Sequence, residues 1–232
     1  MGAEIHQSAA RIRVDCVFVD LDGTIINSRS LLGLLRVLRN RLNPERPPWF
    51  VHYCEELSEM IANSVSRERL NRFYYTAYRG LLVDDVRRMG EEWFRAASLS
   101  RDFFNDETVR SVRKYSQEGA RIVLVTGSFA PGAEPVARSL GCDAALCTNL
   151  EQDGGRYTGN VDGDPCIGLE KAKRVVAFAA ERDLALETCV AFGDDDSDAA
   201  MLGAVGVAHW VTPTARYRTE LARGLDALLD GP

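Results

Sequence analysis

Apolar and polar positions along the chain alternate between blocks typical of buried strands and blocks with helical spacing. The block V-x-C-V-F-V is apolar on both faces, which predicts a central strand over residues 14–19 covered by helices on each side. The other expected strands cover 121–126, 143–147, 188–192 and 205–210, and the expected helices cover 105–119, 132–140, 171–182, 197–202 and 215–229. Strands alternating with helices predict an α/β protein with a doubly wound, mostly parallel sheet.

Residues 25–102 interrupt this alternation directly after the first strand. Five leucines with helical spacing come first, and after a proline-rich break at 44–48 further helices are expected over 49–64, 67–79 and 84–97. We find no convincing strand pattern in this stretch. We therefore predict two domains, a core over 1–24 and 103–232 and an inserted all-helical domain over 25–102 above the strand ends. The segment L-E-Q-D-G-G-R-Y-T-G-N-V predicts a hairpin that turns at Asp153-Gly154-Gly155.

Composition and charge narrow the function classes. A hydrophobic content of 46% with 27% charged residues is ordinary for a soluble globular protein, and the net charge of -6 argues against a nucleic-acid binder. The chain shows no apolar run long enough to span a membrane and no signal-peptide core, so we expect a cytoplasmic protein without a membrane partner. Six dispersed cysteines without a C-x-x-C pair favour buried thiols. Monomer and homodimer both stay open.

The first predicted strand ends in two carboxylates, within the stretch V-F-V-D-L-D-G-T over 17–24. Asp20 and Asp22 are one residue apart, so at a strand end they would point toward the same side and repel each other. A divalent cation between them would relieve that repulsion. An Asp-Gly pair is also a common turn, so this motif alone leaves a purely structural interpretation open.

Three further polar clusters follow in an order that makes the set far more specific than any member. Thr126-Gly127-Ser128 ends the second buried strand, Lys171 opens the helix after the hairpin, and G-D-D-D-S-D over 193–198 follows a later strand. Ligands of open parallel sheets bind beyond the carboxyl ends of the strands, where the strand order reverses. Taken singly, these clusters would be a helix cap, a solvated lysine and an acidic loop.

Together the four clusters suit phosphoryl transfer through an aspartyl phosphate. A carboxylate is a competent nucleophile toward a phosphoryl group, but its charge requires cations beside it. Asp20 and Asp194 would hold Mg²⁺ together with waters and phosphate oxygens. Lys171 would add a fixed positive charge, and Thr126 with nearby backbone N–H groups would bind the equatorial oxygens. Asp22 would protonate the leaving alkoxide and later deprotonate water.

The ordered motifs V-D-L-D-G-T, V-T-G-S, a lysine and G-D-D-D-S-D-A-A-M-L resemble those of the haloacid dehalogenase (HAD) superfamily. The helical insertion looks like its C1 cap, and the motif surroundings look like subfamily IB, the phosphoserine phosphatase-like branch. The resemblance implies a Rossmann-like core and a Mg²⁺-dependent phosphomonoester hydrolase. It also implies roles for matching residues: Asp20 as nucleophile and metal ligand, Asp22 as acid/base with its carbonyl at the metal, Asp194 as metal ligand, Asp195 and Asp198 near the metal, and Gly23, Thr126, Gly127, Ser128 and Lys171 at the phosphate.

Two departures from that branch concern the substrate. Arg29 lies about where related phosphatases carry a glutamate for the ammonium of phosphoserine, and an arginine would favour a carboxylate, a second phosphate or hydroxyls instead. We therefore expect a small phosphorylated metabolite other than phosphoserine, with Arg29 at the substrate. Asp195 replaces a serine or glycine and has no assigned purpose. A phosphotransferase or mutase, and a non-catalytic phosphate-binding module, remain alternatives; a dehalogenase would need neither Asp22 nor Asp194.

Overall fold

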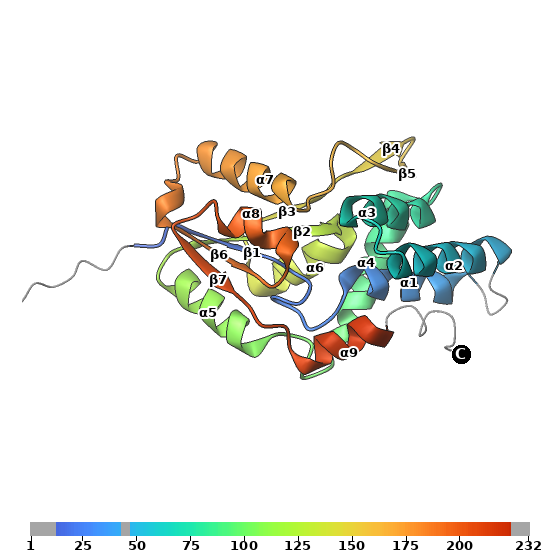
Figure 1. Cartoon of the computed structure of the whole chain (residues 1–232), viewed down its shortest axis with the longest axis horizontal. Coiled ribbons are helices and arrows are strands. Elements are labelled where there is room, and N and C mark those ends of the chain that lie inside the picture. The colour runs from blue at the N-terminus through green and yellow to red at the C-terminus, as the bar shows by residue number, and fades with distance from the viewer. Residues whose placement is uncertain (1–12, 43–46, 224–232) are drawn as a thin grey trace, which may run out of the picture.

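The computed structural model describes residues 13–42 and 47–223. A five-stranded sheet with helices on both faces forms one end of the molecule, and the helices between residues 30 and 97 form the other end (Figure 1). The predicted closing helix is present as α9 (Ala215–Arg223), and the remainder of its expected range lies outside the described residues.

The sheet is parallel throughout and has the strand order β3-β2-β1-β6-β7. Its strands are β1 (Cys16–Val19), β2 (Arg121–Phe129), β3 (Ala144–Thr148), β6 (Cys189–Gly193) and β7 (Val207–Trp210). The chain moves outward from β1 to β3 on one side and from β6 to β7 on the other. The strand order therefore reverses between β1 and β6, which confirms the predicted doubly wound sheet. Ligands of such sheets bind at the carboxyl ends of the strands beside this reversal.

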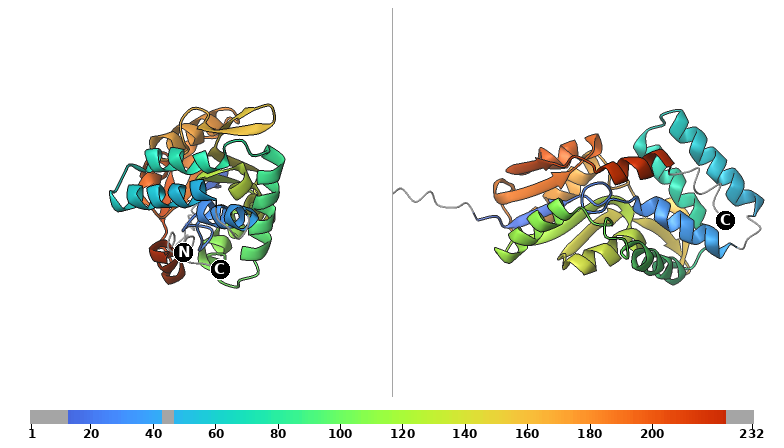
Figure 2. Two further views of the ribbon diagram at one scale, coloured as in Figure 1. Left: turned by 90° about the vertical axis from the view of Figure 1, so that its right-hand side faces the viewer. Right: turned by 90° about the horizontal axis from the view of Figure 1, so that it is seen from below.

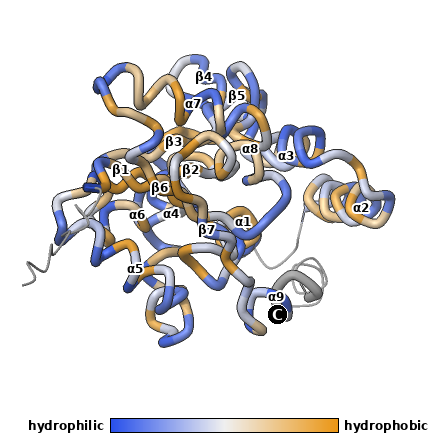
Figure 3. Tube along the Cα trace, turned by 60° about the vertical axis from the view of Figure 1, so that its left-hand side comes forward, coloured by the Kyte–Doolittle hydropathy of each residue, from blue (hydrophilic) through white to orange (hydrophobic). Residues whose placement is uncertain are grey.

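Successive residues of the central strands point to opposite faces of the sheet. Cys16 and Phe18 face α7 (Leu169–Ala180) and α8 (Ala199–Leu202), whereas Val17 and Val19 face the opposite layer. That layer contains α5 (Asp106–Gln117) and α6 (Ala130–Leu140). Apolar residues are concentrated along β1, β2 and β6 (Figure 3). Helices on both faces explain why these strands lack a polar face.

In its described residues, the helical insertion contains four helices and one short 3₁₀ turn. They are α1 (Ser30–Arg41), α2 (Pro48–Ala62), α3 (Arg67–Tyr75), η1 (Thr76–Tyr78) and α4 (Val83–Ala97). The described residues between 25 and 102 form no strand, only isolated bridges at Ile26 and Leu82. The helices therefore agree with the predicted insertion, while the domain boundaries themselves stay a prediction.

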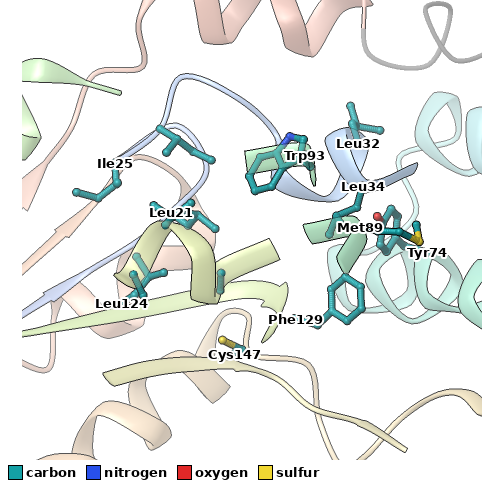
Figure 4. Close-up of a cluster of buried hydrophobic side chains, with 14 of the residues drawn as sticks. Leu21, Ile25, Leu32, Leu34, Tyr74, Met89, Trp93, Leu124, Phe129 and Cys147 are labelled. Carbon is teal, nitrogen blue, oxygen red and sulfur yellow. The ribbon is translucent and has the colours of Figure 1, made fainter. Parts of the chain in front are cut away.

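One hydrophobic cluster runs from the sheet into the insertion (Figure 4). Leu21 and Leu124 belong to its sheet side, Phe129 lies between, and Tyr74 and Met89 belong to the insertion. The ring of Phe129 packs 5.1 Å from the rings of both Tyr75 and Tyr78. These aromatic side chains fill the core between the two parts.

The predicted hairpin is confirmed as β4 (Leu150–Asp153) and β5 (Arg156–Val161). Gly154 and Gly155 form its turn with φ of 54° and 76°, a left-handed backbone that glycine adopts without strain. The hairpin also holds the insertion: Tyr157 N–H donates to the Leu81 carbonyl at 3.0 Å, and Gly80 N–H donates to the Tyr157 carbonyl at 2.8 Å.

The structure corrects the predicted end of the second strand and start of the next helix. β2 continues past Thr126 to Phe129, which pairs with Thr148 of β3 beyond an irregularity in register. Helix α6 begins at Ala130 instead of Gly132, with Pro131 in its first turn, where no backbone N–H is needed. Pairing with β3, which local sequence does not show, extends the strand.

Two short 3₁₀ turns, η2 (Leu186–Thr188) and η3 (Asp196–Asp198), flank β6. Among the described residues, the six cysteines form no disulfide, and five of them are buried, as expected, with Cys142 partly exposed. Within the described ranges, every helix is too short or too polar to cross a membrane.

Figure 2 shows α9 beside the start of the insertion, where the hydroxyl of Thr214 donates to the side-chain oxygen of Asn27 at 2.8 Å.

Candidate active site

A cavity of about 360 Å³ opens between the carboxyl ends of β1, β2 and β6 and the helical insertion. Asp20 follows β1, Thr126 lies in β2, Asp194 follows β6, and Lys171 comes from the first turn of α7. All four line this cavity together with Asp22. The residues predicted from four separate motifs therefore meet at the edge where the strand order reverses.

Lys171 links two of the predicted carboxylates at the centre of the site. Its ammonium donates to Asp20 Oδ1 and to Asp198 Oδ1, each at 2.5 Å, and the residue is only 2% exposed. Burial lowers the pKa of Lys171, but the charges of Asp20 and Asp198 outweigh burial and leave it raised. Burial, and then the Asp198 charge, raise the pKa of Asp20 despite the adjacent ammonium. Lys171 is thus a fixed cation beside Asp20.

Asp194 completes a group of three carboxylates. Oxygen atoms of Asp20, Asp194 and Asp198 lie within 4.8 Å of one another, and Thr24 Oγ1 donates to Asp194 Oδ1 at 2.8 Å. Asp198 Oδ2 accepts the backbone N–H groups of Asp194 and Asp195, at 3.1 and 3.3 Å. Burial and the neighbouring acids raise the pKa of Asp194. Three carboxylates beside one ammonium leave excess negative charge, so this oxygen set fits a hard divalent cation such as Mg²⁺.

Both oxygens of Asp22 are held by the residue that begins α1. Ser30 donates its backbone N–H to Asp22 Oδ1 and its hydroxyl to Asp22 Oδ2, both at 2.9 Å. Burial raises the pKa of Asp22 to about 7, although these hydrogen bonds favour the ionised form. Sequence reasoning missed Ser30; the available signal was a hydroxyl at the start of a helix near the two aspartates. Its Oγ also lies 2.9 Å from Ser128 Oγ.

Gly23 lets the first and last motif loops approach each other. Its φ of +93° favours glycine, and a Cβ atom at this position would lie 2.3 Å from Asp194 Oδ2 and 2.8 Å from the Tyr217 ring. A side chain here would therefore displace Asp194 or the aromatic ring. The glycine of the first motif is needed for the assembly of the carboxylate group.

The Thr126-Gly127-Ser128 loop is tied to the insertion. The Gly127 carbonyl accepts hydrogen bonds from Asn71 at 3.0 Å and Tyr75 at 2.7 Å, both from α3. Thr126 Oγ1 accepts the Ser128 N–H at 3.0 Å, and all three loop residues line the cavity. The predicted phosphate loop thus lies at the cavity, in direct contact with the helices that cover it.

Arg29 and Asp195, the two departures noted in the sequence, both line the cavity. The buried Nε of Arg29 has no hydrogen-bond partner among the described residues, and its guanidinium carbon lies 5.9 Å from the ring centroid of Tyr217. Asp195 accepts the Ser197 N–H at 2.9 Å and caps η3, and it pairs with Arg67 of α3 at 2.8 Å. Asp195 therefore connects the acidic loop to the insertion, a role that sequence reasoning did not find.

The pattern of the haloacid dehalogenase-like hydrolase family matches residues 17–203. The chain belongs to this family. Two curated relatives are 31% and 33% identical, each over 89% of this chain: the "Inhibition of morphological differentiation protein" of Streptomyces azureus, 75% of which is covered, and the "Phosphoserine phosphatase SerB1" of Mycobacterium tuberculosis, 67% of which is covered.

Solved structures support the same fold. A Bordetella pertussis protein of unknown function aligns with a TM-score of 0.75 at 24% identity, covering 90% of this chain and 96% of that one. A substrate-bound phosphoserine phosphatase aligns with a TM-score of 0.60 at 17% identity, covering 84% of each chain. The HAD fold and the phosphoserine phosphatase-like resemblance are confirmed, and this HAD hydrolase is a phosphoric monoester hydrolase.

Proposed function

We propose that this protein is a Mg²⁺-dependent phosphatase that hydrolyses a small phosphorylated metabolite through a phosphorylated Asp20. One observation carries the proposal. The Asp20 carboxylate, 6% exposed, lines the cavity, is bound by the Lys171 ammonium at 2.5 Å and lies in one group with Asp194 and Asp198. Such a carboxylate is held in position for attack on a phosphoryl group beside a fixed cation.

The metal would be held by the carboxylates of Asp20 and Asp194 and by the backbone carbonyl of Asp22, with Asp195 and Asp198 behind them. Mg²⁺ prefers oxygen ligands, and when bound it neutralises charge on phosphate oxygens. Asp198 is already fixed by Lys171 and by two backbone N–H groups, so it orients the acidic loop from behind. Thr24 holds the carboxylate of Asp194 in place by donating its hydroxyl hydrogen to Oδ1.

In the first half-reaction, an oxygen of Asp20 forms a bond to phosphorus as the bond from phosphorus to the alcohol oxygen breaks. Asp22 gives its proton to that leaving oxygen. In the second half, Asp22 takes a proton from water, and the water oxygen attacks phosphorus. The bond between phosphorus and Asp20 breaks, which releases phosphate and restores the carboxylate. Ser30 holds both oxygens of Asp22 and would fix it for both proton transfers.

The remaining predicted residues would bind the phosphoryl group. Lys171 places its charge beside Asp20, and Thr126, Gly127 and Ser128 line the same cavity at the end of β2. Gly23 permits the close approach of the motif loops. The cavity is at the lower end of the range of about 300–1,000 Å³ that ligand sites span, which supports a small substrate.

The test is phosphate release from a panel of small phosphomonoesters, with Mg²⁺ and with a chelator. Asp20→Asn should lower Mg²⁺-dependent release at least about 10³-fold, because removal of a nucleophile leaves little of the pathway. Asp153→Asn, an exposed aspartate at the hairpin turn, is the matched control and should retain activity. Undiminished release by Asp20→Asn would overturn the mechanism. Adding acceptor alcohols separates hydrolysis from the phosphotransferase alternative.

A further inference from the structure

The insertion lines the cavity with an aliphatic set of side chains, beside Arg29, Arg67, Asn71 and Tyr74. We call this set the aliphatic wall, and it consists of Leu31, Leu32, Leu57, Ile61, Val65 and Leu70. Ile167, on the segment before α7, adds an apolar side chain from the core. Single exposed apolar residues are ordinary on proteins, but a contiguous set that lines a concave site beside converging polar groups is typical of ligand binding.

The wall is not simply packed core. Leu32 and Leu57 are 7% and 2% exposed, so most of their surface is packed against the protein, whereas Ile61 is 44% exposed. Leu31, Val65 and Leu70 are partly exposed. These side chains line the cavity where an apolar group of a ligand could remove their surface from water. Burial of that surface would stabilise a bound alkyl group.

Negative charge in the cavity is segregated from this wall, whereas the cations Arg29 and Arg67 line the cavity from the insertion. The carboxylates that line the cavity, Asp20, Asp22, Asp194, Asp195 and Asp198, all belong to the motif loops. All five are bound to Lys171, Ser30, Thr24 or Arg67. Within the described part of the chain, the wall thus offers no carboxylate to an ammonium group, and a cationic alcohol there would lose water without gaining a partner.

We propose that the leaving alcohol of the substrate presents aliphatic carbons to this wall and carries no ammonium group. The inference rests on the proposed phosphatase function and names the chemical class of its substrate, a phosphomonoester of a short, uncharged or anionic aliphatic alcohol. Ile61 and Leu70 are the specificity-determining residues, because they line the cavity while staying partly exposed.

The experiment measures kcat/KM for methyl, ethyl, propyl and butyl phosphate, with phosphoethanolamine as the cationic counterpart of propyl phosphate. Beyond ethyl, these alcohols differ little in acidity, so chain length reports binding rather than leaving-group chemistry. Each methylene buried on the wall should raise kcat/KM about fourfold, and phosphoethanolamine should fall at least about tenfold below propyl phosphate. Dissociation constants of the corresponding alkylphosphonates give the same series without turnover.

Ile61→Asn and Leu70→Asn should each lower the ratio of butyl to methyl phosphate at least about threefold. Val176→Asn is the matched control, because Val176 is 45% exposed on α7 and lies outside the cavity; it should leave that ratio unchanged. A flat chain-length series, a preference for phosphoethanolamine, or an unchanged ratio in both wall variants would overturn the inference while leaving phosphatase activity intact. Failure to hydrolyse any ester would overturn the proposed function instead, and the phosphonate series would still test the wall.

Discussion

Two regions of the cavity are stabilised by different interactions. One is the aliphatic wall, and the other, which we call the floor, comprises the charged residues at the carboxyl ends of the strands. On the floor, Asp20, Lys171 and Asp198 are buried and connected by ion pairs. On the wall, Ile61 and its neighbours present hydrocarbon that is partly in contact with water. A buried charge tolerates little displacement because its partner is then left unpaired, whereas aliphatic surfaces accept changes of shape at smaller cost.

This difference separates the two parts of the proposed function. The floor determines which reaction is possible, because its geometry fixes a nucleophile, a cation and an acid/base. The wall determines which alcohol is accepted, through the area that the alcohol buries. Substrate choice could therefore change through the insertion while the reaction stays the same. Three predictions test this contrast between floor and wall.

Replacing Lys171 by Met should produce the largest effect. The substitution leaves Asp20 and Asp198 buried without their shared cation, and breaking a buried pair costs about 3–5 kcal/mol of unfolding free energy. Phosphate release should also fall at least about 10²-fold, because the fixed charge beside the phosphoryl group is lost. Urea unfolding in the presence of a chelator and steady-state kinetics measure the two effects.

Lys173→Met is the matched control on the same helix. Lys173 is 69% exposed and, among the described residues, pairs only with Glu170, so its replacement should change the unfolding free energy by no more than about 0.5 kcal/mol. If the two variants were equally stable, the floor would not depend on its buried charges.

The floor was largely predictable from sequence, and the wall was not. Asp20, Asp22 and Asp194 were predictable because charged residues after apolar strands are conspicuous, and parallel strands bring their carboxyl ends to one edge. Lys171, in the first turn of α7, was predicted from its place after the hairpin and its match to the ordered motifs. Ser30 was missed because a serine at a helix start is ordinary, and only the structure shows that it holds Asp22.

The sheet was predictable for a similar reason. The continuous apolar block of β1, which buries Phe18 on one face and Val19 on the other, is visible locally. In contrast, the leucines of the insertion have helical spacing, which does not distinguish Leu57, buried at 2%, from Ile61, which stays exposed in the cavity. That distinction depends on how helices pack on one another, and so does the partner of Asp195, which lies 128 residues away in the chain.

Gly90→Ala should have an intermediate effect and tests how the insertion that carries the wall is packed on the core. Gly90 in α4 faces α6 so closely that an added Cβ would lie 2.0 Å from the Pro131 carbonyl oxygen. Alanine normally stabilises a helix interior by about 0.5–1 kcal/mol relative to glycine. Here overpacking should instead lower the unfolding free energy by about 1–3 kcal/mol, as measured by urea denaturation. Arg95→Ala on the exposed side of α4 is the control and should be near neutral. Equal or greater stability of Gly90→Ala would show that the insertion is not held by this packing.

The smallest effect should come from the ion pair between Arg67 of α3 and Asp195 of the acidic loop, which joins the insertion to the motif loops. Its side chains are 51% and 35% exposed, so their coupling in a double-mutant cycle of alanine variants should be about 0.2–1 kcal/mol in unfolding free energy and should weaken with salt. The exposed pair Arg88–Asp85 lies within α4 and serves as the matched cycle. Both cycles should give similar couplings in stability, but only the Arg67–Asp195 cycle should give a coupling in kcat/KM, because only this pair connects α3 with the acidic loop. A coupling in kcat/KM that is absent from both cycles would mean that the floor works independently of how the wall is attached.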